Sequence, residues 1–433
     1  MKYYLAIDLG ATSGRHVVSF FNGKVIVLEE IHRFKTGMDD SKDGLIWDLE
    51  RIYNEILIGI KKAFGKYNNE IVSLAIDSWG VDYVLLDEND KAIKPFYAYR
   101  NVRNEKVIDE VHSIINFDEL YKKTGIQFAT FNTIYQLYSD NKTEKNKNAK
   151  DMLMLPEYFS FLLTGKKARE YTNASTTGLI NLTTNKFDEE IIKKLDLPSY
   201  VNKDLVKPGY VLGRLNKKTK EFVNGDCNVI LCATHDTASA FESIETKENS
   251  VIISSGTWSL LGIKSKTPIV SKEAQESNFT NEGGPNYIRF LKNIMGLWIA
   301  NQLSVELNVD IPSICKNLNE PNKDLVFDVN DASLLNPKSM KQAILKLLSK
   351  NDLSNEELFS STYYSLALCY KEAIKNLEKI INSTINTIYI IGGGANNKYL
   401  NNLVKEVTKK EVIALPIEAT CLGNIKIQIK ANS

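Results

Sequence analysis

The chain contains few residues that form disulfides or metal centres. There are five cysteines and four histidines among 433 residues. No two cysteines have the C-x-x-C spacing of zinc or redox sites, and their odd number leaves one without a partner. We therefore expect reduced thiols and a cytoplasmic protein.

The chain also lacks an excess of either charge and a long hydrophobic run. Lys and Arg number 54 against 53 Asp and Glu, so the sequence predicts no basic surface for nucleic acid. Asp8 ends the first apolar stretch, and Pro156 and Glu157 interrupt the stretch from Met152 to Leu163. No signal peptide or membrane span is expected. These features favour a globular protein that binds small ligands, and they leave its oligomeric state open.

Two common nucleotide-binding patterns, G-x-x-x-x-G-K-[ST] and G-x-G-x-x-G, are absent. The chain has two similar hairpin patterns instead. Strand-like residues 3–8 and 16–21 flank a small, hydroxyl-rich turn around Gly10, and residues 251–253 and 260–263 flank a similar turn around Gly256. The repeat predicts two related halves.

Helical and strand patterns follow each hairpin. Apolar residues recur every three or four positions in Trp47–Tyr67, and Asn355–Ile381 is predicted as one helix that is buried on more than one face. The pattern predicts an α/β protein with mixed sheets flanked by helices and a ligand cleft between domains 1–242 and 243–433. Ser139–Lys150 and Leu318–Asp331 are polar and lack periodicity, so solvated loops are expected there.

Four segments are candidates for chemistry, and each has a structural alternative. The turn with Arg15 suits a phosphate chain, but a tight turn with a solvated arginine is the alternative. Gly392–Gly394 lets a ligand approach the backbone, or allows a helix to cross a strand closely. Asp236 follows a predicted strand and is either a general base or a helix N-cap. Asp8 is either a turn residue or a carboxylate that attracts Mg²⁺.

Aromatic residues and a histidine accompany these segments. His235 precedes Asp236 and suits a hydroxylated ligand, although most histidines are simply packed or hydrogen-bonded. Trp79 and Trp298 fit either a sugar site or the hydrophobic core. The sequence alone does not decide between these alternatives.

Taken together, seven blocks resemble the FGGY carbohydrate kinases over nearly the whole chain. The blocks are Ala6–Arg15, Ile76–Asp82, Glu170–Ala174, His235–Ser239, Ser254–Leu260, Leu291–Trp298 and Gly392–Gly394. The resemblance implies two actin-like, ribonuclease H-like domains that close on a deep cleft. The first domain is expected to bind mainly sugar and the second mainly ATP.

The resemblance also implies roles for individual residues. Asp236 is the expected catalytic base, and Asp8 is expected near Mg²⁺. The expected nucleotide contacts are Ala11, Thr12, Ser13, Gly14, Arg15, Thr257, Asn301 and Gly394. The expected sugar contacts are Gly80, His235, Asp236, Thr237 and Asn293.

The implied reaction moves the γ-phosphoryl group of MgATP to the 1-hydroxyl of a small ketose, L-rhamnulose. L-Fuculose and L-xylulose are alternative ketoses, and an actin-like ATP switch or a sugar-binding regulator is an alternative without catalysis. The chain departs from the family pattern at Asn101-Val102, Asn301 and Lys426, and it ends soon after Glu418–Asn424. The second domain is therefore expected to be shortened at its C-terminus.

Overall fold

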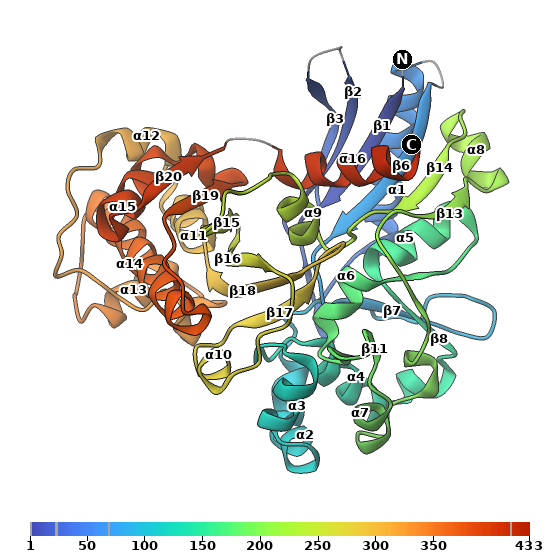
Figure 1. The fold of residues 1–433 in the computed structure, drawn as a ribbon, viewed down its shortest axis with the longest axis horizontal. Helices are drawn as coiled ribbons and strands as arrows, with labels where there is room; N and C mark the ends of the chain where they lie inside the picture. Colours follow the sequence, from blue (N-terminus) through green and yellow to red (C-terminus); the bar gives the residue numbers. More distant parts are fainter. Residues whose placement is uncertain (1, 22–24, 68–69, 416–417) are drawn as a thin grey trace.

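The structure is a computed structural model that describes residues 2–21, 25–67, 70–415 and 418–433. It contains two domains, and each is built around a six-stranded mixed sheet with helices on its faces (Figure 1). The predicted class, an α/β protein with mixed sheets, is therefore confirmed. In the described part of the chain, no helix is long and apolar enough to cross a bilayer.

The first sheet has the strand order β13-β14-β6-β1-β2-β3. Strand β1 pairs with β2 in antiparallel and with β6 in parallel orientation, so β6 and β1 are the two central strands of the sheet. The strands of this sheet are β1 (Tyr3–Leu9), β2 (Ser13–Phe21), β3 (Ile26–Lys35), β6 (Ile71–Ser78), β13 (Tyr210–Arg214) and β14 (Asn228–Leu231).

The second sheet repeats the core of the first. Along β18-β16-β15-β19-β20 the pairings are antiparallel, antiparallel, parallel and parallel, as they are along β3-β2-β1-β6-β14. The common pattern supports the two related halves predicted from the hairpins. The strands are β15 (Ser250–Ser255), β16 (Trp258–Ser265), β17 (Thr280–Gly283), β18 (Ile288–Met295), β19 (Thr387–Ile391) and β20 (Glu411–Ala414).

Helix α1 (Leu49–Lys66) covers one face of the first sheet, within the range predicted from its periodicity. Asp48 caps it by accepting a hydrogen bond from the Arg51 amide at 3.0 Å. The apolar stripe that includes Ile52, Ile56 and Ile60 is fully buried. Burial of this stripe, rather than helix propensity alone, stabilises the helix in this position.

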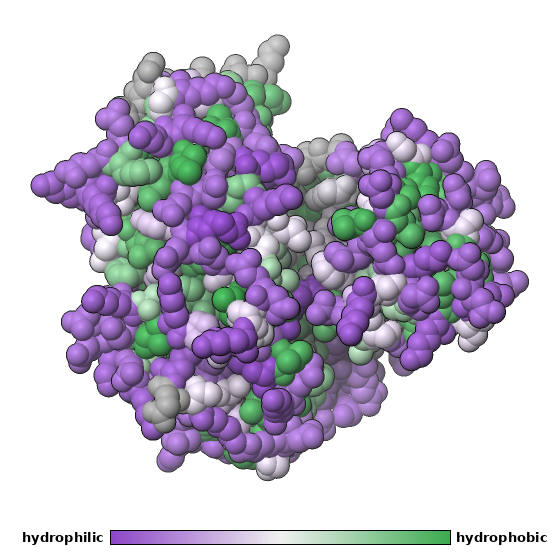
Figure 2. Space-filling model, turned by 180° about the vertical axis from the view of Figure 1, so that it is seen from behind, coloured by the Kyte–Doolittle hydropathy of each residue, from purple (hydrophilic) through white to green (hydrophobic). Residues whose placement is uncertain are grey.

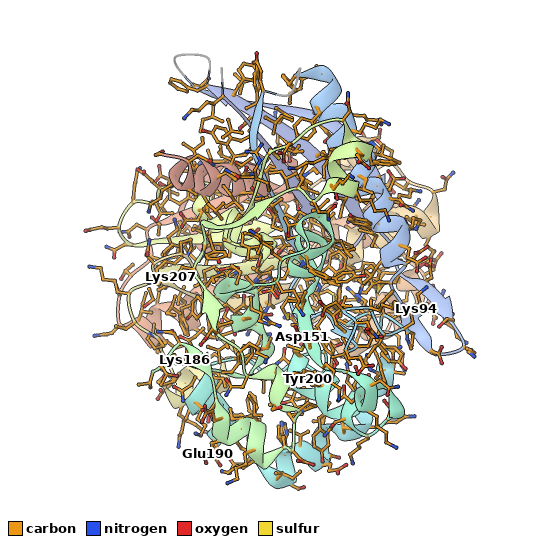
Figure 3. The ribbon with its side chains drawn as sticks, turned by 90° about the vertical axis from the view of Figure 1, so that its right-hand side faces the viewer. Lys94, Asp151, Lys186, Glu190, Tyr200 and Lys207 are labelled. Atoms are coloured by element: carbon orange, nitrogen blue, oxygen red, sulfur yellow. The ribbon has the colours of Figure 1, made fainter. Side chains whose placement is uncertain are left out.

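A mostly helical region is inserted between β6 and β13 and has its own hydrophobic core. It lies below the first sheet in Figure 1. From the side, Asp151 and Tyr200 lie among its side chains and Glu190 near its lower end (Figure 3). Its main elements are β7 (Tyr83–Leu86), α2 (Ile108–Ile114), α3 (Phe117–Thr124), α4 (Thr133–Asn141), β8 (Asp151–Met154), β9 (Arg169–Glu170), α6 (Tyr171–Ala174), β10 (Ile180–Asn181), β11 (Lys186–Phe187), α7 (Glu189–Lys194) and β12 (Leu205–Val206). Helix α5 (Leu155–Thr164) lies in the same stretch of chain but packs on the first sheet.

Helices also surround the second sheet. Helix α14 (Asn355–Ile381) has the predicted ends because Ser354 and Glu357 form a capping box and Asn382 ends the helix in a left-handed conformation. Its side chains are buried on several faces, as expected. The other helices are α8 (Lys217–Val223) in the first domain and α10 (Lys272–Glu276), α11 (Trp298–Leu307), α12 (Ile311–Asn317), α13 (Met340–Leu347) and α15 (Lys398–Thr408) in the second.

The two segments expected as solvated loops are more buried than their composition suggests. Asp140 is 1% exposed and accepts a hydrogen bond from the Tyr83 hydroxyl. In the other segment, Leu325, Phe327 and Val329 are buried, and the last two belong to the core of the second domain. The second segment has no helix or strand, as expected of a loop, but neither segment is solvated throughout, because a few buried side chains anchor each of them.

The last helix of the chain, α16 (Ala419–Ala431), returns to the first domain. It crosses α9 (Asp236–Glu242) and lies on the first sheet (Figure 1). The Gln428 side-chain amide donates to the Leu5 carbonyl at 3.0 Å and accepts from the Ser73 hydroxyl at 2.7 Å. Lys426 donates to the Ser243 carbonyl that ends α9. The C-terminal helix therefore holds the two domains together.

Candidate active site

The two hairpin turns line the same cavity, which has a volume of about 300 Å³ and lies between the domains. From behind, the surface is hollowed where the two domains meet (Figure 2). The first turn contributes Gly10, Ala11 and Thr12, and the second contributes Gly256 and Thr257. The paired turns therefore face one another across a shared space.

Hydrogen bonds fix the first turn. The Gly10 amide donates to the Ser13 carbonyl at 3.0 Å, and the Thr36 hydroxyl donates to the Gly10 carbonyl at 2.6 Å. Gly14 has no room for a side chain, because a Cβ atom would lie 2.4 Å from the Phe34 ring. The turn is thus held rigidly, with small residues toward the cavity.

Arg15 also lines the cavity and is not a solvated arginine. Its guanidinium donates to Asp8 Oδ2 at 2.9 and 2.7 Å and pairs with Glu418, which precedes α16. This contact ties the first turn to the C-terminal helix.

The second turn and the glycines after β19 form the opposite wall. The Gly256 carbonyl accepts a hydrogen bond from the Leu297 amide at 2.9 Å, which connects the turn to the start of α11. Gly392 and Gly393 line the cavity. Gly394 lies against Ser255, where a Cβ atom would be 2.0 Å from the hydroxyl oxygen.

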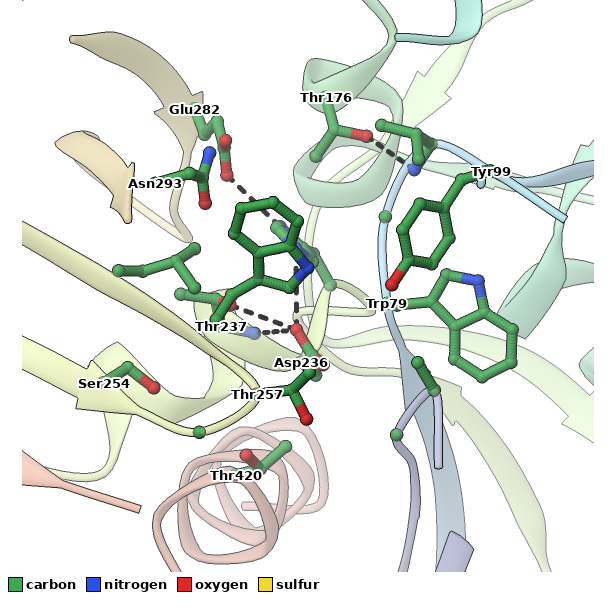
Figure 4. Close-up of a pocket in the computed structure, with 18 of the residues that line it drawn as sticks. Trp79, Tyr99, Thr176, Asp236, Thr237, Ser254, Thr257, Glu282, Asn293 and Thr420 are labelled. Carbon is green, nitrogen blue, oxygen red and sulfur yellow. Dashed lines mark hydrogen bonds and ion pairs between the residues drawn. The ribbon is translucent and has the colours of Figure 1, made fainter. Parts of the chain in front are cut away.

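Asp236 enters the cavity at the seam of the two domains (Figure 4). It is the first residue of α9, and His235 occupies the N-cap position. Its carboxyl oxygen Oδ1 accepts hydrogen bonds from the Thr237 amide at 2.5 Å and the Thr237 hydroxyl at 3.1 Å. The side chain remains 28% exposed, so a ligand has access to it.

The environment of Asp236 makes its carboxylate a better proton acceptor. Burial raises the pKa of Asp236, and the negative charge of Asp8 adds to this effect, whereas His235 and the Thr237 hydrogen bonds lower it. The net shift is upward, toward the range that suits a general base at neutral pH.

A buried carboxylate holds the segment that leads to Asp236. Glu170 is fully buried and accepts hydrogen bonds from the Thr234 amide at 3.0 Å and the Thr234 hydroxyl at 2.7 Å. It also accepts from the Thr172 amide and hydroxyl. These bonds fix the chain between β14 and α9, and with it the direction of Asp236.

Aromatic side chains line the first domain's side of the cavity. The indole nitrogens of Trp47 and Trp79 donate to Asp82 Oδ2 at 2.7 and 2.9 Å, and the Tyr99 amide donates to the same oxygen. Trp79, Tyr99 and Phe131 reach the cavity. Trp79 is therefore both a packed core residue and part of the cavity wall, whereas Trp298 is not among the cavity residues.

The second domain contributes an amide to the same wall. Asn293, on β18, donates its backbone and side-chain N–H groups to Gln127 Oε1 at 3.3 and 3.1 Å. Gln127 belongs to the first domain, and both residues line the cavity. This part of the cavity wall is therefore also built from both domains.

Two carboxylates lie side by side at the ends of parallel strands. Asp8 on β1 is in register with Asp77 on β6, and Asn424 of α16 donates to Asp77 Oδ2 at 2.6 Å. The other oxygen of Asp77 is buried without a hydrogen-bond partner. Burial and the charge of Asp8 raise the pKa of Asp77 well above its ordinary value. Within the described ranges, no group of three His, Cys, Asp or Glu residues forms a metal-binding cluster.

The predicted site residues divide into two groups. Those that line the cavity are Ala11, Thr12, Arg15, Gly80, His235, Asp236, Thr237, Thr257 and Asn293. Those that are not among its lining residues are Asp8, Ser13, Gly14, Asn301 and Gly394. Asp8 still contacts the cavity through Arg15, whereas Asn301 is exposed on α11.

Sequence reasoning overlooked Asp77, Glu282 and Arg289. Asp77 had a detectable signal, because it directly follows the mostly apolar run Ile71–Ile76, as Asp8 follows the first apolar stretch. Glu282 and Arg289 lie on paired strands at an edge of the second sheet. Nothing local in their sequence indicates that they approach His235.

The two domains enclose one cavity that is lined by both hairpin turns and by the Asp236 carboxylate, and the sequence comparisons give the family. Residues 3–241 match the N-terminal domain of the FGGY family of carbohydrate kinases, and residues 251–431 match the C-terminal domain. The chain therefore belongs to the FGGY family of carbohydrate kinases, which confirms the resemblance read from its motifs.

Among its relatives, a rhamnulokinase of Oceanobacillus iheyensis is 42% identical over 439 residues, covering 99% of this chain and 93% of the relative. A rhamnulokinase of Halalkalibacterium halodurans is 43% identical with the same coverage.

Solved structures share the fold at low identity. A gluconate kinase from Lactobacillus acidophilus superposes with a TM-score of 0.82 at 16% identity, covering 100% of this chain and 89% of that structure. A xylulose kinase from the same organism gives a TM-score of 0.83 at 16% identity, with coverage of 100% and 90%. The expected two-domain actin-like fold is confirmed.

Proposed function

We propose that this chain transfers the γ-phosphoryl group of ATP to the 1-hydroxyl of L-rhamnulose and forms L-rhamnulose 1-phosphate in the breakdown of L-rhamnose. The observation that carries the proposal is the presence of Asp236 and both hairpin turns in one cavity. Identities of 42% and 43% to rhamnulokinases over nearly the whole chain favour this sugar. The five unpaired cysteines suit a cytoplasmic enzyme.

In the proposed reaction, Asp236 accepts the proton of the sugar 1-hydroxyl. The oxygen of that hydroxyl attacks the γ-phosphorus at the same time. The bond between the γ-phosphorus and the β–γ bridging oxygen breaks, and ADP leaves with the electron pair. Phosphoryl transfer depends mainly on positioning and on stabilisation of charge. Backbone N–H groups of the turns around Gly10 and Gly256 and the guanidinium of Arg15 are suited to hold the phosphates.

Asp8 is the carboxylate that would hold a magnesium ion together with the nucleotide, because it contacts Arg15, which lines the cavity. Mg²⁺ binds through one or two carboxylates together with water and substrate phosphates. Asp77, in register with Asp8 on the neighbouring strand, is fully buried and does not line the cavity. A bound Mg²⁺ ion would neutralise negative charge on the phosphates.

ADP release, measured with MgATP against a panel of sugars, tests the proposal. The panel contains L-rhamnulose, L-fuculose, L-xylulose and glycerol, and the expected result is the highest kcat/KM with L-rhamnulose. A higher value for another ketose would reassign the substrate. ATP hydrolysis at the same rate with and without ketose would indicate an ATP switch and contradict the proposal.

A further inference from the structure

A buried arginine of the second domain contacts the histidine that precedes Asp236. Arg289, on β18, is fully buried, and its Nη2 atom lies 3.0 Å from Nδ1 of His235. A second bond, from Arg289 Nε to the Gly283 carbonyl at 2.9 Å, fixes the guanidinium. His235 is only 7% exposed. The contact therefore joins the two domains next to the proposed base.

The chemistry of the two groups determines the proton position on His235. A guanidinium has only N–H donors and keeps its charge in proteins. Nδ1 of His235 must therefore offer a lone pair to Arg289, which leaves the proton on Nε2 of a neutral ring.

Glu282 competes for the same nitrogen. Its Oε2 atom is 3.3 Å from His235 Nδ1 and 3.1 Å from Arg289 Nη2. A carboxylate favours a proton on Nδ1, opposite to the effect of the arginine. Of the two contacts of His235 Nδ1, only the one with Arg289 also has the angles of a hydrogen bond. The arginine therefore sets the tautomer, and Glu282 balances the positive charge of Arg289.

The other ring nitrogen points to the catalytic side. Nε2 of His235 lies 3.5 Å from Asp236 Oδ1 and 3.3 Å from the position that a Cβ atom would have on Gly80. An N–H donor and a carboxylate acceptor thus stand together at the cavity wall.

We propose that Arg289 is a positioning residue that holds His235 as the neutral Nε2–H tautomer, so that one substrate hydroxyl accepts from His235 and donates to Asp236. The catalytic part of this inference rests on the proposed function, in which Asp236 is the base. The tautomer itself is a property of the unliganded protein. Arg289, rather than Glu282, determines it.

The first experiment measures the tautomer directly. ¹⁵N NMR of the imidazole nitrogens distinguishes protonated from unprotonated nitrogens, and the chain has only four histidines to assign. We expect His235 in the unliganded wild-type protein at pH 7.5 to show an unprotonated Nδ1 and a protonated Nε2. A protonated Nδ1 would overturn the proposal.

The second experiment changes the partners of Nδ1. Arg289→Met leaves Glu282 as the neighbour of Nδ1, so the proton should move to Nδ1 and kcat should fall by about 10- to 100-fold. Arg289→Lys retains a cationic donor and should keep the wild-type tautomer. Glu282→Gln is the matched control, because it removes the carboxylate but leaves Arg289, and the tautomer should not change.

A combined variant covers the case in which Arg289→Met does not fold. Arg289→Met combined with Glu282→Gln removes both buried charges. The side-chain amide that Glu282→Gln introduces can donate a hydrogen bond to Nδ1 of His235. The Nε2–H tautomer should return in this protein. A wild-type tautomer in Arg289→Met, or a changed one in Arg289→Lys, would contradict the role of Arg289. Absence of ketose phosphorylation with the expected tautomers would instead contradict the proposed function.

Discussion

A Cβ atom added to Gly423 on α16 would lie 1.7 Å from the Ser239 carbonyl oxygen on α9. The two helices thus cross with their backbones in contact, and only glycine allows this approach. Because α9 begins with Asp236 and α16 lies on the first sheet, the crossing fixes the height of the proposed base above the sheet.

We predict that Gly423→Ala forces α9 and α16 apart and lowers stability by about 1 to 3 kcal/mol, the usual range for an overpacked core. The shift of α9 should also lower kcat, because Asp236 moves with the helix. Urea unfolding and steady-state kinetics measure the two effects. Gly65→Ala on α1 is the control, because no atom lies within 4 Å of its Cβ position and the change should stabilise the helix by about 0.5 to 1 kcal/mol. Equal effects of the two changes would refute the close crossing.

The second prediction concerns the base itself. Asp236→Asn preserves an oxygen for the Thr237 amide and hydroxyl, so the fold should persist, but it removes the proton acceptor. Turnover should fall at least about a hundredfold with little change in ATP affinity. Asp204→Asn, at an exposed position of the same domain, is the control and should match the wild type. Near-wild-type turnover in Asp236→Asn would exclude this residue as the base.

The glycines after β19 allow a test of nucleotide position. Gly393 lines the cavity and has no atom within 4 Å of its Cβ position, whereas Gly394 is packed against Ser255. If ATP passes along this wall, Gly393→Ala should raise the KM for ATP by about tenfold, or about 1.4 kcal/mol, without changing the melting temperature.

Gly394→Ala is the counterpart of this substitution. The added methyl group meets the Ser255 hydroxyl, so the main effect of this substitution should be a lower melting temperature. An unchanged KM for ATP in Gly393→Ala would show that the nucleotide binds elsewhere in the cavity.

The predictable features were those whose causes are local in the sequence. Turns rich in glycine and hydroxyl residues revealed both hairpins, and Asn355–Ile381 was predicted as one helix, as α14 is. Asp140 and Phe327 were missed because their burial depends on distant elements. The contact of Arg289 with His235 depends on the register of β17 and β18 and on how the domains meet, and local sequence determines neither.

The last prediction concerns the pH dependence of stability. His16 on β2 is fully buried, its Nε2–H donates to the Ile56 carbonyl at 3.1 Å, and its Nδ1 has no hydrogen-bond partner. Burial lowers the pKa of His16 to about 3, with smaller contributions from His32 and Lys62. The contribution of neutral His16 to the free energy of unfolding is therefore complete above the pKa of histidine in the unfolded chain, about 6.5. It is lost as the pH falls toward about 3.

Between pH 7.5 and pH 5, the unfolded chain gains a proton that the folded His16 does not. The loss is about 2 kcal/mol, since each pH unit below the unfolded pKa costs about 1.4 kcal/mol. His16→Phe should make stability less sensitive to acid by this amount. Urea unfolding at the two pH values measures the difference within each variant, so that packing effects cancel. His112→Phe replaces a partly exposed histidine with a smaller downward pKa shift, and it should leave most of the acid sensitivity in place. If the free energy of unfolding of His16→Phe falls between pH 7.5 and pH 5 as much as that of the wild type, His16 takes up a proton in the folded state.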